Sequence, residues 1–376
     1  MAHRIGDRPA AKTNGTGSAV RAEPRPGRCV VAAGDPRGDR EEILRLAGHL
    51  PDSPGAERFA KYYDRSPYGP PSVVLAREPG SDRAVGMAAL MPTRLRVGGQ
   101  PVPAAISGDF SIDPEYRGFG PALALQRASL KTLPERGWMC AFGCPNELSE
   151  PIVKRVGFEE TGPLTRYVKV LRTQLLVGAY VRRPRLRRML SAAGHVTADP
   201  VLRAVSRERR GRLALERPAM FDERFAEVFE ATARAHALTG ERSAEVLNWK
   251  YELDTGRPSP YSILAAVEGD GRVAGYVVYR VKDGVWHLFD LATLGPTQAI
   301  DALLSGVVGA ARQEGALGVG LLCLGSLGPL GRRLRSFGFL PRVEDKRLRV
   351  YLPERPAGAD PLRPDNWYFV MGDDDF

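Results

Sequence analysis

Several polar residues with catalytic potential lie within and beside one glycine-rich turn. Asp109 stands between Ser107 and Ser111 in an apolar, alternating segment, and a carboxylate placed in this way can act as a general base. The segment ends at Asp113, and the turn Arg-Gly-Phe-Gly-Pro-Ala follows at 117–122. Small residues in such a turn let the backbone approach a ligand closely. These residue types predict an anion-binding turn beside a proton acceptor.

A strand before this turn and a helix after it would hold the polar residues in place. The alternating residues up to Asp113 predict the strand, and a helix-forming run over 123–130 predicts the helix. Pro121 suits the first helical position, where its missing N–H group has no partner to lose. The free N–H groups of the first turn would point at a phosphate, whose charge the helix dipole favours. An ordinary glycine turn without a ligand is the alternative.

A second group of polar residues follows the predicted helix. A short buried strand is expected over 138–143, and Asn146 and Ser149 precede a helix that ends at Gly157 and Phe158. Asn146 suits the N-cap of this helix, a role that needs no ligand. An N-cap that also contacts a bound cofactor is the other interpretation.

Together these segments resemble motif A and the following helix of the GNAT superfamily, the Gcn5-related N-acetyltransferases. Arg117, Gly120 and Ala122 fill the fixed positions of the pyrophosphate-binding pattern Arg/Gln-x-x-Gly-x-Gly/Ala. The resemblance implies that the ligand is the pyrophosphate of coenzyme A, or the phosphopantetheine of an acyl carrier protein. It also implies a reaction that joins an acyl thioester to an amine.

The resemblance further implies which residues contact the acyl donor. A backbone amide of the strand before the loop would donate to the thioester carbonyl, in the region from Ser111 to Asp113. The implied donor-binding residues are Ser111, Ile112, Asp113, Arg117, Gly118, Phe119, Gly120, Pro121, Ala122, Asn146 and Ser149.

The general base and the general acid are less well defined. An acidic residue on this strand often supplies the base in the family, which favours Asp109. We expect Asp109 to share one strand face with Ser107 and Ser111, so that a polar row faces a cleft. Pairing with an arginine is the alternative. Many family members have a Tyr four residues before the glycine, where it can protonate the leaving thiolate, but this chain has Val153.

The C-terminal half repeats the order of the N-terminal half. A hairpin is expected from the strands 261–267 and 273–279, and the strand 286–292 follows it. Asp290 precedes Gly338 by the same spacing that separates Asp109 from Gly157. Asp290 is therefore the second catalytic candidate, with a buried ion pair as its alternative. No Arg-x-x-Gly-x-Gly/Ala pattern follows Asp290, so one donor site is expected, in the first half.

These features predict an α/β protein with two GNAT-like domains, each a mixed, mostly antiparallel twisted sheet flanked by helices. This is the tandem-GNAT arrangement with a degenerate second domain. The expected segments are a disordered tail over 1–28, a domain with the cofactor loop over 29–172, a basic helical connector over 173–210 and a domain without the loop over 211–376.

Composition narrows the function classes. The four cysteines, at 29, 140, 144 and 323, have neither metal-ligand spacing nor a disulfide framework, and no metal is expected. Cys29, Cys140 and Cys323 are expected in buried strands, and an acyl-cysteine route at Cys144 is an alternative. The sequence has no apolar run long enough for a membrane span and no apolar signal core, which favours a cytoplasmic protein.

Three further features bear on partners. The net charge of +10 is concentrated in arginines at 182–188 and 207–212, which predict a solvated helix face, a docking surface for an acidic carrier protein or cofactor, or contact with nucleic acid. Aspartates at 373–375 predict an exposed acidic tail, with binding of a cationic acceptor as the alternative. Tyr62 and Trp249 are expected to pack helices onto the sheet, with a pocket-lining role as the alternative.

The sequence as a whole favours an enzyme of the acyltransferase class. The donor would be acyl-CoA or acyl carrier protein, and the acceptor an amine of a small molecule, an aminosugar or a peptide. The alternatives are a Fem-type transferase that takes its acyl group from tRNA and a non-catalytic module that binds acyl-CoA.

Overall fold

The computed structural model describes residues 29–50, 55–175, 213–295, 298–356 and 358–374. The predicted tail over 1–28 and nearly all of the predicted connector, with both arginine clusters, lie outside this part of the chain. The described strands are β1 (Val30–Gly34), β2 (Ser72–Arg77), β3 (Ala84–Val97), β4 (Gln100–Ile112), β5 (Ala141–Gly143), β6 (Glu159–Val170), β7 (Ala214–Glu216), β8 (Leu238–Gly240), β9 (Tyr261–Val267), β10 (Val273–Lys282), β11 (Val285–Thr293), β12 (Gly318–Leu324), β13 (Leu340–Tyr351) and β14 (Trp367–Tyr368).

The helices lie between these strands. They are α1 (Arg40–Ala47), α2 (Gly55–Phe59), α3 (Phe119–Leu130), α4 (Thr132–Glu135), α5 (Glu150–Arg155), α8 (Ala226–Ala235), α9 (Ala244–Lys250), α10 (Gln298–Gln313) and α11 (Gly328–Ser336). A π-helical turn, η1 (Ala60–Asp64), continues α2, and short 3₁₀ turns are η2 (Pro114–Tyr116), η3 (Glu223–Phe225), η4 (Pro364–Asn366) and η5 (Met371–Asp373).

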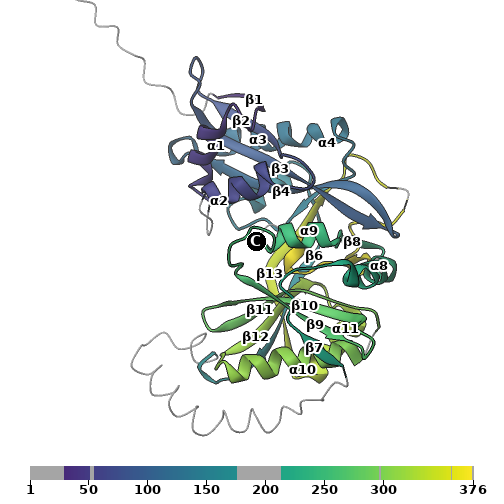
Figure 1. Cartoon of the computed structure of the whole chain (residues 1–376). Coiled ribbons are helices and arrows are strands. Elements are labelled where there is room, and N and C mark those ends of the chain that lie inside the picture. Colours follow the sequence, from purple (N-terminus) through teal and green to yellow (C-terminus); the bar gives the residue numbers. More distant parts are fainter. Residues whose placement is uncertain (1–28, 51–54, 176–212, 296–297, 357, 375–376) are drawn as a thin grey trace, which may run out of the picture.

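The described strands form one continuous sheet. Its main path runs β1-β2-β3-β4-β5-β13-β6-β12-β11-β10-β9-β7, with β8 and β14 beside it. Most neighbours are antiparallel, whereas β4 with β5 and β11 with β12 are parallel. The prediction of a mixed, mostly antiparallel sheet flanked by helices is confirmed, and Figure 1 shows the strands of the first half above those of the second.

The two halves have the same order of elements. In the first half β2, β3 and β4 precede α3, β5, α5 and β6, and in the second β9, β10 and β11 precede α10, β12, α11 and β13. The predicted hairpin of the second half is confirmed, because β9 and β10 pair antiparallel from Val273 opposite Val267.

The halves also exchange strands. β13 of the second half pairs with β5 of the first, with Tyr351 opposite Ala141, and then with β6. β6 of the first half in turn pairs with β12 of the second, with Val170 opposite Gly318. β6 and β13 thus run through the middle of the molecule (Figure 1). The sheet is therefore continuous across the boundary between the halves.

Helices cover both faces of each half. Apolar residues of α1 and α2, among them Leu46 and Phe59, pack on one face of β2 and β3, and α3 packs on the other face through Leu125. In the second half α10 covers one face through Leu303 and Val307. This layering packs β4 between helices on both faces, and β4 carries Asp109, Ser111 and Ile112 of the predicted site.

Candidate active site

β4 and β5 diverge after two paired residues. Ala105 pairs with Ala141 and Ile106 with Phe142, and no further pair between these strands occurs in the described residues. On its other side β4 stays paired with β3 as far as Ile112. The stretch 107–112 therefore turns one edge of backbone N–H and C=O groups toward an opening, where an extended ligand can form hydrogen bonds.

A β-bulge interrupts β4 at Asp109. The register shifts between Met87 and Ala89 of β3, and Asp109 has a φ of 43°. Ser107 pairs with Leu90 and Ser111 pairs with Met87, and those partners are three positions apart, so they lie on opposite faces. The expected single row of polar residues is therefore wrong, because the bulge changes the alternation of the strand.

Asp109 faces α2 and η1, where it forms a buried ion pair. Its carboxylate accepts hydrogen bonds from Arg58 Nε and from Tyr63 Oη, the latter at 2.8 Å. The Asp109 side chain is 1% exposed. Burial and the Asp109 carboxylate raise the pKa of Tyr63 well above its ordinary value, so Tyr63 stays protonated and donates. Both carboxylate oxygens of the first catalytic candidate are thus engaged.

The glycine turn opens onto free space at the start of α3. Gly118 precedes the first helical residue, and its carbonyl accepts from Ala122 N at 3.3 Å. A Cβ atom at Gly118 or at Gly120 would meet no protein atom within 4 Å. Arg117 is exposed, with Nε 3.4 Å from the Ile112 carbonyl. These residues, with Pro121 in the first turn, leave room for a ligand against the helix N-terminus.

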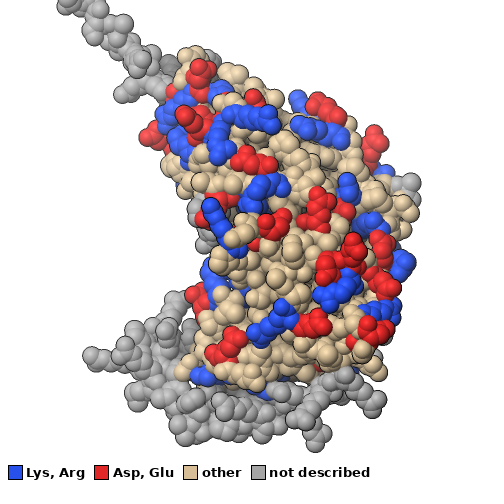
Figure 2. Space-filling view, in the orientation of Figure 1, with Lys and Arg blue, Asp and Glu red and all other residues tan. Residues whose placement is uncertain are grey.

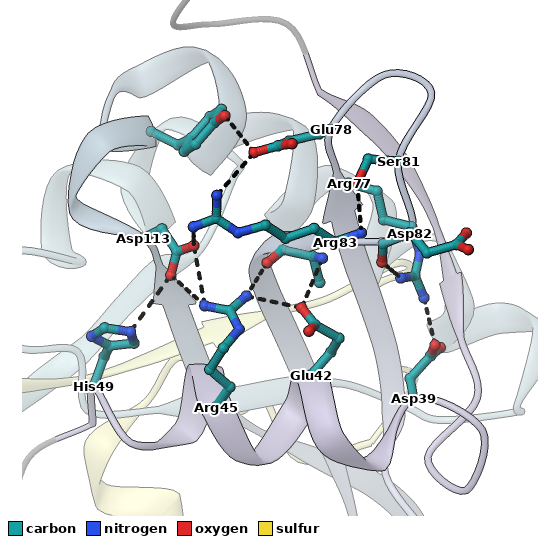
Figure 3. Close-up of polar contacts among 12 residues, drawn as sticks. Asp39, Glu42, Arg45, His49, Arg77, Glu78, Ser81, Asp82, Arg83 and Asp113 are labelled. Atoms are coloured by element: carbon teal, nitrogen blue, oxygen red, sulfur yellow. Dashed lines mark hydrogen bonds and ion pairs between the residues drawn. The ribbon is translucent and has the colours of Figure 1, made fainter. Parts of the chain in front are cut away.

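Asp113 fixes the start of this turn to neighbouring elements. Its carboxylate contacts Arg45 Nη1 at 3.0 and 3.2 Å, Arg83 Nη2 at 3.2 Å and His49 Nε2 at 3.5 Å. Figure 3 shows Arg45 of α1, His49 just after α1 and Arg83 before β3 converging on Asp113. The carboxylate is thus committed to the protein, and a donor contact at this position would use the backbone.

Asn146 and Ser149 cap each other. Asn146 Oδ1 accepts from Leu148 N at 3.1 Å and from Ser149 N at 3.0 Å, while Ser149 Oγ accepts from Asn146 N at 3.1 Å. Asn146 therefore caps the turn that leads into α5, whose N-cap residue is Ser149 and not Asn146 as predicted, and a cofactor contact stays a prediction. Val153, at the usual tyrosine position, is buried in the core with Phe158.

Asp290 lies in a second buried ion pair. It accepts from Arg242 Nε at 3.0 and 3.2 Å and from Tyr276 Oη at 3.1 Å. Burial raises the pKa of Asp290, and Arg242 acts in the opposite direction. The arrangement repeats that of Asp109, because each carboxylate has an arginine and a tyrosine as partners. The buried ion pair foreseen as the alternative for Asp290 is what the structure shows.

The C-terminal segment returns to the boundary between the halves. Leu324 N donates to the Phe369 carbonyl at 3.0 Å, and η5 follows. Asp373 is 5% exposed and binds Arg242 Nη2 at 2.7 Å. Asp374 lies beside Cys144, and its Oδ1 would stand 3.9 Å from a Cβ at Gly143. The expected exposed acidic tail is therefore wrong for Asp373 and Asp374, and Asp375 lies outside the described residues.

Asp374 differs from the other two carboxylates in its surroundings. Burial raises its pKa, whereas Lys346 and the Cys144 thiol act to lower it. Its partners among the described residues are a lysine and a thiol rather than an arginine. Burial and the neighbouring Asp374 in turn raise the pKa of Cys144 well above its ordinary value, which argues against a thiolate nucleophile at this cysteine.

A pocket next to Asp374 joins the two halves. It is a small cavity of about 30 Å³, and it is lined by Tyr62, Ser66, Tyr68, Met91, Pro92, Thr93, Ile106, Glu241, Val246, Trp249, Lys250, Gly372 and Asp374. Tyr62 and Tyr68 meet Trp249 edge-on, with ring centroids 5.6 and 6.3 Å apart. Tyr68 Oη donates to Glu241 at 2.9 Å. Tyr62 packs against the core as expected, and Tyr62 and Trp249 also line this pocket.

The remaining sequence predictions concern cysteines and metals. Cys140 and Cys323 are buried core residues, and burial raises the pKa of Cys140 to about 12. Cys29 is only partly buried and precedes β1, so its expected place in a buried strand is wrong. Within the described ranges no three His, Cys, Asp or Glu residues cluster as metal ligands do. No helix in those ranges is both long and apolar enough to cross a bilayer.

Comparison with known proteins adds to this geometry. Residues 41–161 match the family model described as an acetyltransferase (GNAT) domain. A conserved protein from Enterococcus faecalis V583, described as a probable N-acyltransferase, is similar over 86% of this chain and 73% of its own, with a TM-score of 0.63 and 16% identity. No curated protein matches the sequence.

Two further solved structures are similar over most of the chain. A GCN5-related N-acetyltransferase from Kribbella flavida covers 86% of this chain and 71% of its own, with a TM-score of 0.56 and 18% identity. N-myristoyltransferase from Saccharomyces cerevisiae with bound myristoyl-CoA covers 95% of this chain and 92% of its own, with a TM-score of 0.57 and 14% identity.

At these identities the solved structures establish the fold, and the family match identifies the segment that carries the loop. Asp109, the turn at 117–122 and Asn146 all lie within the matched segment. The shared fold extends over both halves, which agrees with two GNAT-like domains. Residues 41–161 thus match the acetyltransferase (GNAT) domain model, and the chain as a whole has the GNAT fold.

Proposed function

We propose that this protein is an N-acyltransferase that moves an acyl group from acyl-CoA, or from the phosphopantetheine of an acyl carrier protein, to an amine. The observation that carries the proposal is the opening between β4 and β5, which leads to the glycine turn at 117–122. We also propose that the segments 29–172 and 211–376 are the two domains and that the first binds the donor.

The donor would lie along the unpaired edge of β4. The N–H groups around Gly118 and Gly120 face open space at the N-terminus of α3, where a pyrophosphate fits, and Arg117 adds a positive charge nearby. The pantetheine amides would pair with the free edge of 107–112. A backbone N–H in the 111–113 region would stabilise the negative charge that develops on the thioester carbonyl oxygen.

The acceptor amine would enter through the pocket between the halves. Ile106, the last β4 residue paired with β5, and Asp374 both line this pocket, so the pocket adjoins the opening. The amine nitrogen attacks the thioester carbonyl carbon, a C–N bond forms, and the C–S bond breaks. Aromatic side chains and a partly buried carboxylate suit an ammonium group that must lose its proton before attack.

Asp374 is the carboxylate best placed to take that proton. Its pKa is raised by burial, which makes it a better proton acceptor than an ordinary aspartate, and it lies at the pocket. Asp109 and Asp290 remain candidates, but each is engaged by an arginine and a tyrosine. Because Val153 is a core residue, we propose that the thiolate takes its proton from water.

The two alternatives make different demands on this site. A Fem-type transferase has no need of a pyrophosphate loop, yet the space beside Gly118 and Gly120 is open here. A non-catalytic module would need no proton acceptor at the pocket, yet the partly buried Asp374 lines it. Both observations favour the acyltransferase.

A binding experiment tests the donor site. Gly120→Glu places bulk and negative charge where the pyrophosphate would lie, so calorimetry with acetyl-CoA and longer acyl-CoAs should show loss of binding with the fold retained. Gly269→Glu is a matched control, because a Cβ at Gly269 also meets nothing within 4 Å and the residue lies in the turn between β9 and β10. Unchanged binding by Gly120→Glu would refute the donor site.

A further inference from the structure

Arg242 is buried between two carboxylates from different parts of the chain. Its side chain is 2% exposed, and it binds Asp290 of β11 through Nε and Asp373 of η5 through Nη2. Nη1 donates to Thr239 Oγ1 and to the Gly240 carbonyl, the latter at 2.9 Å. The planar fork of an arginine can hold two carboxylates in fixed directions, which a lysine cannot do.

The backbone around Asp373 fits closely against the second half. Val370 N donates to Asp373 Oδ2 at 3.0 Å, which closes a turn. A Cβ at Gly372 would overlap Tyr251 Oη, and a Cβ at Gly240 would overlap Asp373 Oδ1. Glycine at 240 and 372 is therefore needed for the segment to lie where it does.

This arrangement contributes little to stability for its size. Buried ion pairs often add no more than an apolar packing of the same volume. Asp373 Oδ1 and Tyr251 Oη are also buried without a hydrogen-bond partner among the described residues. Native proteins contain few such atoms, and those that occur call for an explanation. Precise placement of the segment that ends at Asp374 would explain why these two atoms are left without partners.

We infer that Arg242 is a positioning residue, which fixes Asp373 and thereby holds Asp374 beside Cys144 at the pocket. Asp373 and Asp374 are adjacent in the chain, so fixing the position of Asp373 also restricts the position of Asp374. Arg242 itself is not among the residues that line the pocket, so it acts through the segment 371–374. The catalytic meaning of this placement rests on the proposed function, whereas the placement itself does not.

The reactivity of the Cys144 thiol reports the position of Asp374 without any substrate. Cys144 lies beside Asp374, and burial together with Asp374 raises the pKa of its thiol, which disfavours the thiolate. When Asp374 moves away, iodoacetamide should reach a more acidic thiol. The test is therefore the rate of alkylation at Cys144 in the full chain, followed by tandem mass spectrometry, whose fragment ions distinguish Cys144 from Cys140 on the same tryptic peptide.

Asp373→Asn is the first variant, because it removes one charge and leaves Arg242 paired with Asp290. We expect alkylation of Cys144 to become about tenfold faster or more. Asp301→Asn is the matched control, since Asp301 forms a partly buried ion pair with Arg333 between α10 and α11. This control should alkylate Cys144 at the wild-type rate.

Arg242→Lys is the second variant, in case Asp373→Asn fails to fold. It keeps the charge but cannot hold both carboxylates, so Cys144 should again react faster, with circular dichroism confirming the fold. If a variant that folds alkylates Cys144 at the wild-type rate, the inference that Arg242 fixes the position of Asp374 is wrong.

The kinetic arm separates this inference from the proposed function. If the proposed function holds, Asp373→Asn and Arg242→Lys should lower kcat far more than they change the Kd for acyl-CoA. Fast alkylation of Cys144 with an unchanged kcat would support the positioning role of Arg242 and refute the catalytic role of Asp374.

Discussion

Asp373 and Asp374 are neighbours in the chain, yet Asp373 is held by the second half of the molecule whereas Asp374 reaches a residue of the first. Asp373 binds Arg242 of the second half at 2.7 Å, whereas Asp374 lies beside Cys144, just after β5 of the first half. The C-terminal segment therefore connects the two halves at the pocket. This position makes Asp374 accessible to an acceptor without exposing it on the outer surface.

The first prediction concerns catalysis by Asp374. Asp374→Asn keeps the size of the side chain and removes the proton acceptor, so kcat/KM should fall by roughly 10²–10⁴ while the Kd for acyl-CoA stays the same. The wild-type profile of kcat/KM should rise with pH through the raised pKa of Asp374, because only the ionised form accepts a proton. A variant that keeps this rise would exclude Asp374 as the base.

The second prediction concerns stability and its pH dependence. Burial raises the pKa of Asp374, so the folded protein holds this proton to higher pH than the unfolded chain does. Stability is therefore lost as pH rises from the ordinary pKa through the raised one, and the loss persists above it. Asp374→Asn cannot ionise and should have a higher Tm than wild type at neutral pH. The two proteins should have similar Tm values well below the ordinary pKa of an aspartate, and calorimetric melts across pH measure both.

The third prediction concerns Asp109 and Arg58. Asp109→Asn breaks the buried ion pair between Asp109 and Arg58, and breaking such a pair costs about 3–5 kcal/mol. Arg58 is 13% exposed, so solvent screening favours the lower end of that range. Denaturant unfolding measures the loss, and the double variant Asp109→Asn with Arg58→Gln should recover part of it. If kcat/KM in Asp109→Asn no longer changes with pH, the base is Asp109 after all.

Sequence reasoning found the parts of the site that are local in the chain. The turn at 117–122, the helix after it and the repeated order of elements depend on residues close together, and the structure contains them. The partners of the carboxylates could not be found in this way. Arg58 is 51 residues from Asp109, and Arg242 is 131 residues from Asp373, so only the fold brings each pair together.

Two structural features also could not be predicted from local sequence patterns. The bulge at Asp109 changes the face of the residues on either side of it, and no residue type at that position announces it. The exchange of β6 and β13 depends on pairing between strands from different halves. Alternation along a single strand predicts which residues are buried but not which strand will be the neighbour.

The fourth prediction concerns Gly372. Gly372→Ala places a methyl group against Tyr251 Oη, so it should displace the segment 371–374 and accelerate alkylation of Cys144. Tyr251→Phe alone should be close to neutral, because the hydroxyl that it removes has no hydrogen-bond partner in the described structure. Combined with Gly372→Ala, it should partly restore the slow alkylation. The Phe289 carbonyl, 3.0 Å from the added Cβ, keeps that rescue incomplete.

The last prediction concerns the aromatic wall of the pocket. Trp249 holds its place through Nε1, which donates to the Lys61 carbonyl at 3.0 Å, and its ring meets Tyr62 and Tyr68 edge-on. Trp249→Ala removes this wall, so KM for the amine acceptor should rise with little change in the Kd for acyl-CoA. Trp286→Phe is a control, because Trp286 stacks on Tyr279 in the core of the second half and does not line the pocket. An unchanged acceptor KM in Trp249→Ala would mean that the amine binds elsewhere, whereas a weaker Kd for acyl-CoA would assign this pocket to the acyl chain of the donor.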